Sequence, residues 1–353
     1  MTKKIAVIGG DGIGPEVVAE GVKVLNALAE VRGWKHELIH YDFCADRFLS
    51  DGTTFPNEAF DTIHDECDAV LLGALGDPRV PDMRHARDIL FGLRFGLDLF
   101  INLRPIVCLS DDLMPLKKFK ASDVDITVLR ENTEGIYVGM GGHFKKGTPD
   151  EIAIQEDVNS RKGVERVVRA AFELAVREGK KTVHMADKHN AMMHAHELWY
   201  RTFFEVAKEY PSITSKHVFV DALCLFLVQD PSPFEVIVTC NLFGDIVTDL
   251  GAALQGGMGM AASGNIHPGK VSMFEPVHGS APPLTGKDVA NPLATVLTVG
   301  MLLTHLGYEG EEAKLTELVR RAIETKHCTA EVGGTLGTRA TGDWIAAQIR
   351  AAG

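Results

Sequence analysis

Short apolar runs alternate with longer stretches of helical periodicity along most of the chain. The apolar runs cover residues 4–8, 69–72, 125–129, 182–186 and 236–239. The helical patterns cover residues 15–28, 164–176 and 191–207. Short apolar runs predict buried strands, and apolar positions three and four residues apart predict helices that pack on one face. The alternation therefore predicts an α/β fold, in which functional residues gather where the strands end.

A glycine-rich turn follows the first predicted strand. Gly10, Gly12 and Gly14 come close together, and Pro15 is well placed as the first residue of the following helix. The dinucleotide-binding fingerprint G-x-G-x-x-G requires its last glycine where Pro15 stands. The sequence therefore predicts a tight strand-to-helix turn without a Rossmann fingerprint, so a nicotinamide cofactor would have to bind in another way.

Length and charge narrow the class of protein. The chain has 353 residues, enough for two domains, and a formal net charge of −12. An acidic chain repels nucleic acid and anionic membranes, so we expect neither as a partner. There is no signal-peptide pattern, no run of ~20 apolar residues, and no Cys-x-x-Cys pair among the cysteines. We therefore expect a cytoplasmic protein with reduced thiols.

Three arginines stand at predicted strand ends or turns, at positions 94, 104 and 130. The planar guanidinium of arginine forms paired hydrogen bonds with a carboxylate, so several converging arginines are typical of a dicarboxylate site. Taken one at a time, each arginine is more often a surface or ion-pair residue. The sequence therefore indicates an acidic substrate if Arg94, Arg104 and Arg130 converge.

Asp245 and Asp249 are four residues apart, which places both carboxylates on one face of a helix. Their apolar neighbours, such as Ile246 and Val247, predict a largely buried stretch in which two like charges require a cation. Carboxylate oxygens suit Mg²⁺ or Mn²⁺, and Asp221 is a plausible third ligand. Helix capping and solvated acids explain the spacing equally well.

Two further side chains are suited to proton transfer. Lys188 follows a predicted strand, and a lysine that is partly desolvated beside acids exchanges protons near neutral pH. Tyr137 can donate a proton from its phenol. Four nearby histidines look like a metal cluster, but we do not expect one, because the pair in His194-Ala195-His196 diverges on a helix. The four are His184, His189, His194 and His196.

Residues 275–282 form a loop that is dense in glycine, proline and small side chains. Backbone amides in such a loop can approach a phosphate closely, and His278 could stack on a base. A purely structural loop is an equally good explanation.

Together these stretches resemble the β-decarboxylating dehydrogenases, the family of isopropylmalate, isocitrate, homoisocitrate and tartrate dehydrogenases. The resemblance covers nearly the whole chain and rests on five segments in order. These are residues 10–16 (GDGIGPE), 102–105 (NLRP), 130–137 (RENTEGIY), 241–246 (NLFGDI) and 275–282 (EPVHGSAP).

The resemblance implies two open α/β domains of the isopropylmalate dehydrogenase type. A discontinuous cofactor-side domain would comprise residues 1–100 and 255–353. A central domain of residues 101–254 would carry the dimer interface and an arm at about residues 139–157. The resemblance also implies a homodimer whose active sites borrow residues from the partner subunit.

The same resemblance implies a role for each candidate residue. Arg94, Arg104 and Arg130 would bind the malate carboxylates. Asp245 and Asp249, with Asp221 of the partner subunit, would hold Mg²⁺ or Mn²⁺. Lys188 of the partner subunit would take the hydroxyl proton, and Tyr137 would protonate C3 after CO₂ has left. The residues that would line NAD are Ile13, Glu275, His278, Gly279, Ser280, Ala281 and Asn291.

The residues before Arg94 bear on which hydroxy acid is the substrate. Leu90 and Phe91 offer an apolar wall, and burying an isopropyl group there is worth ~2 kcal/mol, so 3-isopropylmalate is the expected substrate. Tartrate or D-malate, and then homoisocitrate or isocitrate, are the alternatives. Arg87 bears on the last two, because a nearby cation could accommodate an acidic substituent. A non-catalytic regulatory subunit that binds a ligand is the alternative of a different class.

One position departs from the family pattern. Pro283 stands where NAD-using members carry an acid that binds the adenosine ribose, and proline offers no side-chain acceptor. The chain also lacks the Lys-Tyr pair with which NADP-using members bind the 2′-phosphate. We therefore expect NAD as the cofactor, with reduced affinity.

Overall fold

The computed structural model describes residues 2–352. By its internal contacts the chain divides into two compact units. Unit 1 comprises Met1–Leu99, Val107–Ser122 and Ala252–Gly353, and unit 2 comprises Phe100–Ile106 and Asp123–Gly251. Each unit contains strands of a sheet with helices on both faces, so the predicted α/β fold class is confirmed.

Unit 1 contains five strands in the order β2-β1-β3-β12-β11. The strands are β1 (Lys3–Ile8), β2 (His36–Tyr41), β3 (Ala69–Leu72), β11 (Ala262–Ile266) and β12 (Ser272–Pro276). Neighbouring strands are parallel except β11, which is antiparallel to β12. The apolar runs that the sequence assigned to β1 and β3 are almost fully buried because helices cover both of their faces.

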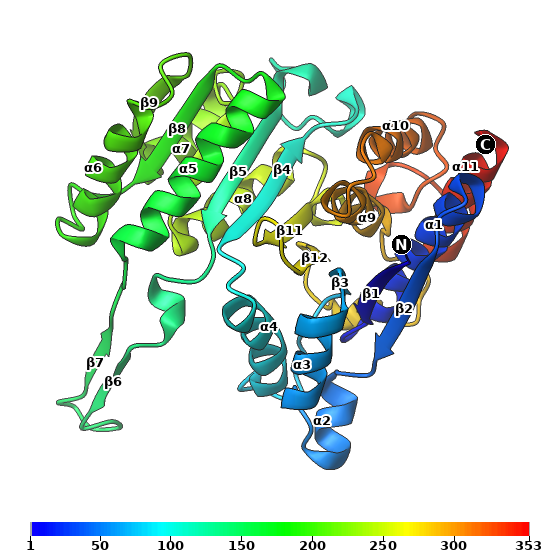
Figure 1. Cartoon of the computed structure of the whole chain (residues 1–353), viewed down its shortest axis with the longest axis horizontal. Helices are drawn as coiled ribbons and strands as arrows, with labels where there is room; N and C mark the ends of the chain where they lie inside the picture. Colours follow the sequence, from blue (N-terminus) through cyan, green and yellow to red (C-terminus); the bar gives the residue numbers. More distant parts are fainter. Residues whose placement is uncertain (1, 353) are drawn as a thin grey trace. The chain divides into compact units, whose positions relative to one another are not determined.

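Helices cover the two faces of this sheet in separate groups (Figure 1). They are α1 (Gly14–Arg32), α2 (Ala45–Asp51), α3 (Asn57–Glu66), α4 (Arg84–Gly96), α9 (Leu293–His305), α10 (Glu311–Glu324) and α11 (Thr338–Ala352). Helix α9 packs on β3, β11 and β12, and α1 packs on α9 and α11. On the other face, Ile63 of α3 and Ile89 of α4 share one core with Ile8 and Leu72.

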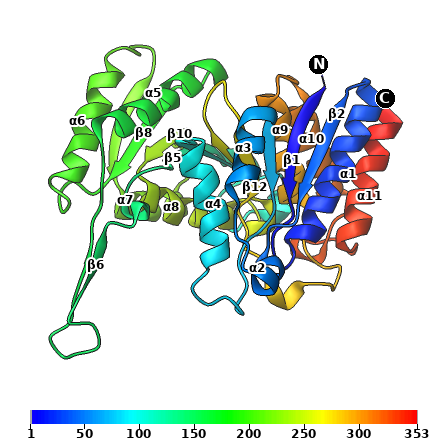
Figure 2. The same cartoon turned by 60° about the horizontal axis from the view of Figure 1, so that its bottom comes forward.

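Unit 2 contains five strands in the order β4-β5-β10-β8-β9. They are β4 (Ile101–Val107), β5 (Asp125–Glu131), β8 (Thr182–Asp187), β9 (Thr214–Phe219) and β10 (Val236–Thr239). Strands β5, β10, β8 and β9 run parallel. Helices α5 (Arg161–Glu178) and α6 (Ala195–Ala207) lie on one face, and α7 (Val220–Gln229) and α8 (Asn241–Leu254) lie on the other (Figures 1 and 2).

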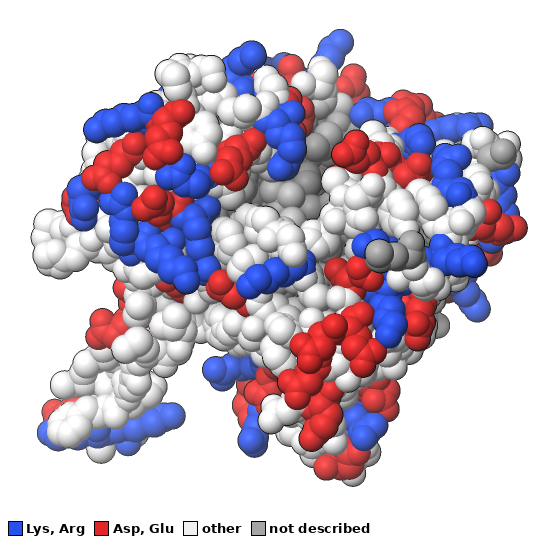
Figure 3. Space-filling view, viewed as in Figure 1, with Lys and Arg blue, Asp and Glu red and all other residues white. Residues whose placement is uncertain are grey.

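A two-stranded hairpin extends from unit 2 (Figure 1). Strands β6 (Gly141–Phe144) and β7 (Ile152–Gln155) are antiparallel, and every residue in them is exposed. Figure 3 shows mostly uncharged side chains along the hairpin and charged ones at its tip. Phe144 is 62% exposed and Ile154 is 56% exposed, so the hairpin presents a large apolar surface.

Short 3₁₀ helices complete the structure, at Asp111–Leu113, Ala121–Asp123, Ile136–Val138, Met258–Met260, Pro282–Leu284 and Ala330–Val332. All five predicted strands are present, but the helix expected from Ala191 begins at Ala195. The backbone N–H groups of Ala191 and Met192 bond to the carbonyl of Lys188 and form a separate turn before α6. Among residues 2–352, no helix is long and apolar enough to cross a membrane.

Candidate active site

Three of the predicted side chains in unit 2 contact Asp245 on α8. Arg130 Nη1 donates to Asp245 Oδ1 at 2.5 Å, and Arg104 Nη2 lies 3.5 Å from the same oxygen. The hydroxyl of Tyr137 donates to Asp245 Oδ2 at 3.4 Å. Both arginines are buried, whereas the side chain of Asp245 is 40% exposed. The cluster therefore contains one solvent-accessible carboxylate, which contacts two buried guanidinium groups.

Two neutral residues of α8 hold these arginines, and the sequence reasoning missed both. Asn241 Oδ1 accepts hydrogen bonds from Arg130 Nε at 3.0 Å and from Nη2 at 2.8 Å. Thr248 Oγ1 accepts one from Arg104 Nη1 at 2.5 Å. A Cβ atom on Gly244 would lie 2.4 Å from Arg130 Cγ, so only glycine allows this approach. The signal in the sequence was a glycine inside a helix, which is costly without a packing reason.

The expectation that the stretch around Asp245 and Asp249 is largely buried is wrong for one face of α8. Val247 is fully buried, but Ile246 is 51% exposed and Asp249 is exposed. The physical reason is the helical period, since a surface helix turns only one face toward the sheet. Partial burial and then the charge of Asp245 raise the pKa of Asp249. A divalent cation would relieve both effects, so this donor pair fits Mg²⁺ or Mn²⁺.

Lys188 and Asp221 form a second pair in unit 2. Lys188 follows β8, Asp221 lies in the first turn of α7 after the neighbouring strand β9, and Lys188 Nζ lies 2.5 Å from Asp221 Oδ1. This hydrogen bond lowers the pKa of the Asp221 carboxyl. Asp221, Asp245 and Asp249 do not form a compact ligand group within one chain. In residues 2–352 the group of three whose ligand atoms lie within 4.8 Å of one another is a different one.

Two of the three arginines do not stand at strand ends or turns as expected. Arg94 lies in the last turn of α4, and Arg104 lies inside β4. Arg94 belongs to unit 1, whereas Arg104 and Arg130 belong to unit 2. Within unit 1, Glu275 Oε1 accepts from Arg94 Nη2 at 3.0 Å and from Asn265 Nδ2 at 2.9 Å. Arg94 and Glu275, which were assigned to substrate and cofactor respectively, are therefore direct neighbours.

Leu90 and Phe91 are adjacent on α4, but their side chains have different surroundings. Leu90 packs against the core of unit 1. Phe91 stacks on Phe95 at a centroid distance of 5.4 Å and lines a pocket of about 790 Å³. Arg87 and Asp88 line the same pocket, so it has charged as well as apolar walls. Consecutive helical residues are about 100° apart, which explains why the two side chains do not form one continuous wall.

The loop predicted to bind a cofactor packs against the glycine-rich turn of unit 1. Ile13 N–H donates to the Ser280 carbonyl at 2.8 Å. A Cβ atom on Gly12 would lie 2.0 Å from that carbonyl oxygen, and Gly12 has a φ of 58°. Ile13 also packs with Ala281 and Ala290. Gly12 is therefore required both for its backbone conformation and for the close approach of the two loops.

Neutral polar groups dominate this loop. His278 is buried, its Nδ1 lies 3.1 Å from the Gly279 carbonyl, and burial lowers its pKa. Its Nε2 is buried and makes no hydrogen bond within the chain. Asn291 Oδ1 accepts from Leu293 N–H at the start of α9, and Pro283 is exposed. A neutral imidazole with a free ring nitrogen beside closely approached backbone fits a nucleotide cofactor.

Comparison with known proteins gives one consistent result. A family model described as isocitrate/isopropylmalate dehydrogenase matches residues 4–346. A protein named 3-isopropylmalate dehydrogenase from Thermobifida fusca is 46% identical over 350 residues, which cover 99% of this chain and 98% of that protein. A protein of the same name from Streptomyces griseus is 47% identical over 342 residues, covering 95% of this chain and 97% of that protein.

A solved structure agrees with these relatives. Isocitrate dehydrogenase from Methylococcus capsulatus superposes with a TM-score of 0.89 at 33% identity, covering 99% of this chain and all of that one. The similarity therefore extends over the entire fold.

Proposed function

The chain belongs to the isocitrate/isopropylmalate dehydrogenase family, and we propose that it oxidises and decarboxylates 3-isopropylmalate in leucine biosynthesis. The observation that carries this proposal is the 46% identity, over nearly all of both chains, to a protein named 3-isopropylmalate dehydrogenase. The predicted class, an NAD-dependent decarboxylating dehydrogenase, follows from family membership. Family membership also argues against the alternative of a non-catalytic regulatory subunit.

We assign the divalent cation, Mg²⁺ or Mn²⁺, to Asp245 and Asp249 together with Asp221 of the partner subunit. When bound, the cation acts as a Lewis acid that stabilises negative charge on the substrate oxygens. Two observations support the assignment: the exposed carboxylate of Asp245 and the raised pKa of Asp249, which is shifted first by burial. The raised pKa indicates that the chain does not fully compensate the charge of Asp249, and the exposure of Asp245 leaves its carboxylate accessible to an ion.

The remaining chemistry is assigned to named side chains. Arg94, Arg104 and Arg130 bind and orient the two carboxylates. Lys188 of the partner subunit accepts the proton of the C2 hydroxyl while the hydride at C2 leaves for the nicotinamide ring. Loss of the C3 carboxylate as CO₂ leaves an enolate, and Tyr137 donates its phenolic proton to C3. The hydrogen bond from Tyr137 to Asp245 supports this role, because it holds the phenol beside the proposed cation site.

We assign NAD to the loop formed by Glu275, His278, Gly279, Ser280, Ala281 and Asn291, with Ile13 on the facing turn. Pro283 provides neither an acid for the ribose nor a cation for a 2′-phosphate. The absence of a cation at this position favours NAD over NADP.

We propose that the protein works as a homodimer. Leu225, Phe226 and Val228 of α7 are 53%, 42% and 49% exposed, and Ile246 of α8 is 51% exposed. Exposed apolar side chains concentrated on two helices and on the hairpin are typical of a surface that another subunit covers. A second copy of the chain also supplies the missing third metal ligand.

The test is NADH formation with Mg²⁺ and each of 3-isopropylmalate, isocitrate, homoisocitrate, D-malate and tartrate. We expect 3-isopropylmalate to lead in kcat/KM by about tenfold or more, equivalent to ~1.4 kcal/mol. A lead for a tricarboxylate would assign Arg87 to the substrate and leave the family membership intact. No turnover of any of the five by the folded protein would restore the regulatory-subunit reading.

A further inference from the structure

Asp187, His189 and His217 come together in unit 2, and none of them has a role in the proposed reaction. Asp187 is the last residue of β8, His189 follows two residues later, and His217 lies on β9. Parallel pairing places Met185 opposite His217 and Asp187 opposite Phe219. Side chains two residues apart on a strand share a face, so Asp187 and His217 are diagonal neighbours on one side of the sheet.

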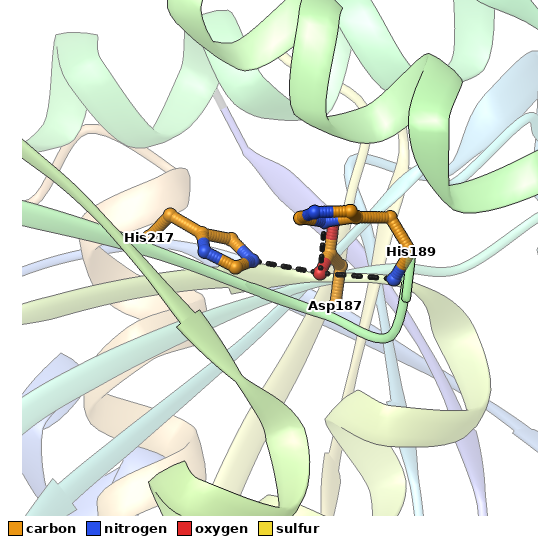
Figure 4. Close-up of side chains that lie close together, drawn as sticks. All are labelled: Asp187, His189 and His217. Carbon is orange, nitrogen blue, oxygen red and sulfur yellow. Dashed lines mark hydrogen bonds and ion pairs between the residues drawn. The ribbon is translucent and has the colours of Figure 1, made fainter. Parts of the chain in front are cut away.

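The metal-ligating atoms of the three side chains lie close together. His217 Nε2 lies 2.8 Å from Asp187 Oδ1, and His189 Nδ1 lies 3.0 Å from each carboxylate oxygen. All three ligand atoms lie within 4.8 Å of one another. Figure 4 shows the two imidazole rings on either side of the carboxylate, each with a nitrogen directed toward it.

Burial distinguishes this group from an ordinary surface ion pair. The Asp187 side chain is 1% exposed, whereas those of His217 and His189 are 17% and 29% exposed. The nearest lysine along the chain, Lys188, has its ammonium group 2.5 Å from Asp221. The partners of the buried carboxylate are therefore the two imidazoles and the backbone N–H of His189, which donates at 3.3 Å. The histidine side of the group is open to an ion from solvent.

We propose that Asp187, His189 and His217 form a binding site for a divalent transition metal ion such as Zn²⁺. Two imidazole nitrogens and one carboxylate oxygen are a ligand set that Zn²⁺ adopts in three-ligand sites, with water in the fourth position. A tetrahedral site with bonds of about 2.0–2.2 Å separates its ligand atoms by about 3.3–3.6 Å. The present hydrogen-bonded separations need to open by only a few tenths of an ångström.

The ligand chemistry separates this site from the proposed Mg²⁺ site. Mg²⁺ takes oxygen ligands in an octahedral arrangement, so Asp221, Asp245 and Asp249 suit it, whereas imidazole nitrogen suits Zn²⁺, Co²⁺ or Ni²⁺. Each histidine binds the metal through a nitrogen that carries no proton. Any N–H now directed at Asp187 must therefore leave the ligating nitrogen, either to the other nitrogen of the same ring or to solvent, when the metal binds.

The experiment measures metal binding directly and does not depend on turnover. The full-length protein is stripped with a chelator, desalted, saturated with Mg²⁺ and titrated with Zn²⁺ by calorimetry at about pH 7.5. We expect one Zn²⁺ per chain to bind in the presence of saturating Mg²⁺. Titration with Co²⁺ should give the strong visible absorption of a four-coordinate ion.

Matched variants locate the binding site. Glutamine in His189→Gln and His217→Gln keeps a hydrogen-bond donor for Asp187 but is a poor metal ligand. Each should weaken Zn²⁺ binding by about 100-fold, since loss of a supporting contact alone costs about 10–100-fold. His64→Gln is the control, because His64 forms a similar pair with Asp65 at 2.6 Å without a second imidazole. Metal-free thermal unfolding should be unchanged in all three.

Equal Zn²⁺ affinity in the wild type and the His189→Gln/His217→Gln double variant would overturn the proposal. Displacement of Zn²⁺ by Mg²⁺ would do the same, because it would place the ion on the acids of the proposed active site. In either case the three residues form a hydrogen-bonded group only. These outcomes leave the proposed dehydrogenase reaction untouched.

Discussion

The two units build their candidate sites from different materials. In unit 2 the polar groups are charged side chains: Arg104 and Arg130 hold Asp245, and Lys188 holds Asp221. In unit 1 the loop proposed for the cofactor has one acid, Glu275, which pairs with Arg94. The rest of the loop is uncharged, with His278, whose pKa is lowered by burial, and a close backbone approach at Gly12. The difference teaches that the groups proposed for metal binding and proton transfer lie in unit 2, whereas unit 1 contributes Arg94 and a loop of closely packed backbone.

Proton transfer in unit 2 should show the largest effect. Lys188→Met removes the proposed base and should lower kcat by about 10²–10⁴-fold, the usual contribution of general acid–base catalysis. The measurement is NADH formation with 3-isopropylmalate at saturating Mg²⁺. Lys180→Met is the matched control, because Lys180 also pairs with an acid, Asp125, at 2.6 Å on the surface. Unchanged turnover in Lys188→Met would remove that lysine from the mechanism.

The carboxylate of Asp249 in unit 2 should also determine how tightly Mg²⁺ binds. Asp249→Asn should raise the Mg²⁺ concentration for half-maximal activity by about 100-fold, more than the loss of a supporting contact, which costs about 10–100-fold. Glu173→Gln, an exposed acid on α5, should leave it unchanged.

The same aspartate predicts a pH dependence. Because burial and Asp245 raise the pKa of Asp249, this carboxyl takes up a proton at a higher pH than an ordinary aspartate does. Mg²⁺ binds the ionised form, so the Mg²⁺ requirement should rise as the pH falls, starting above the ordinary aspartate range. The measurement is Mg²⁺ activation of turnover across mildly acidic pH. A wild-type pH profile identical to that of Asp249→Asn would contradict this prediction.

A substitution in the pocket beside α4 of unit 1 should have a moderate effect on substrate preference. Phe91→Ala removes the apolar wall of the pocket on α4 and should reduce the preference for 3-isopropylmalate over D-malate by about tenfold in kcat/KM. Phe95→Ala is the control, since Phe95 stacks on Phe91 and lines the same pocket. If both variants lose the preference equally, the effect is not specific to Phe91, and the stacked pair as a whole determines the preference.

The smallest expected effect concerns the cofactor loop. Pro283→Asp adds an acceptor for the adenosine ribose and should lower the KM for NAD by about five- to tenfold, because a hydrogen bond to a charged group is worth about 1.5–3 kcal/mol before its costs. Leu284→Asp, one residue further along the same exposed 3₁₀ helix, should have little effect. An equal gain from both substitutions would point to a nonspecific effect of charge.

The local pattern determined much of this protein. Continuous apolar runs specified the buried strands β3 and β10 with their observed ends, because a strand covered on both faces has few polar positions. The spacing of Asp245 and Asp249 indicated a shared helix, and both lie on α8. A glycine-rich turn without a Rossmann fingerprint could be recognised because Pro15 is incompatible with that motif.

Only the tertiary structure decided which side chains meet. Arg130, Arg104 and Tyr137 come from separate elements and converge on Asp245, and Gly244 makes room for Arg130. Likewise, Asp187 meets His217 because β8 and β9 pair in one particular register. The pattern of apolar and polar residues indicates which face of each helix or strand is buried. Contacts between residues far apart in the chain depend on strand order and register, which the periodicity of a single segment does not specify.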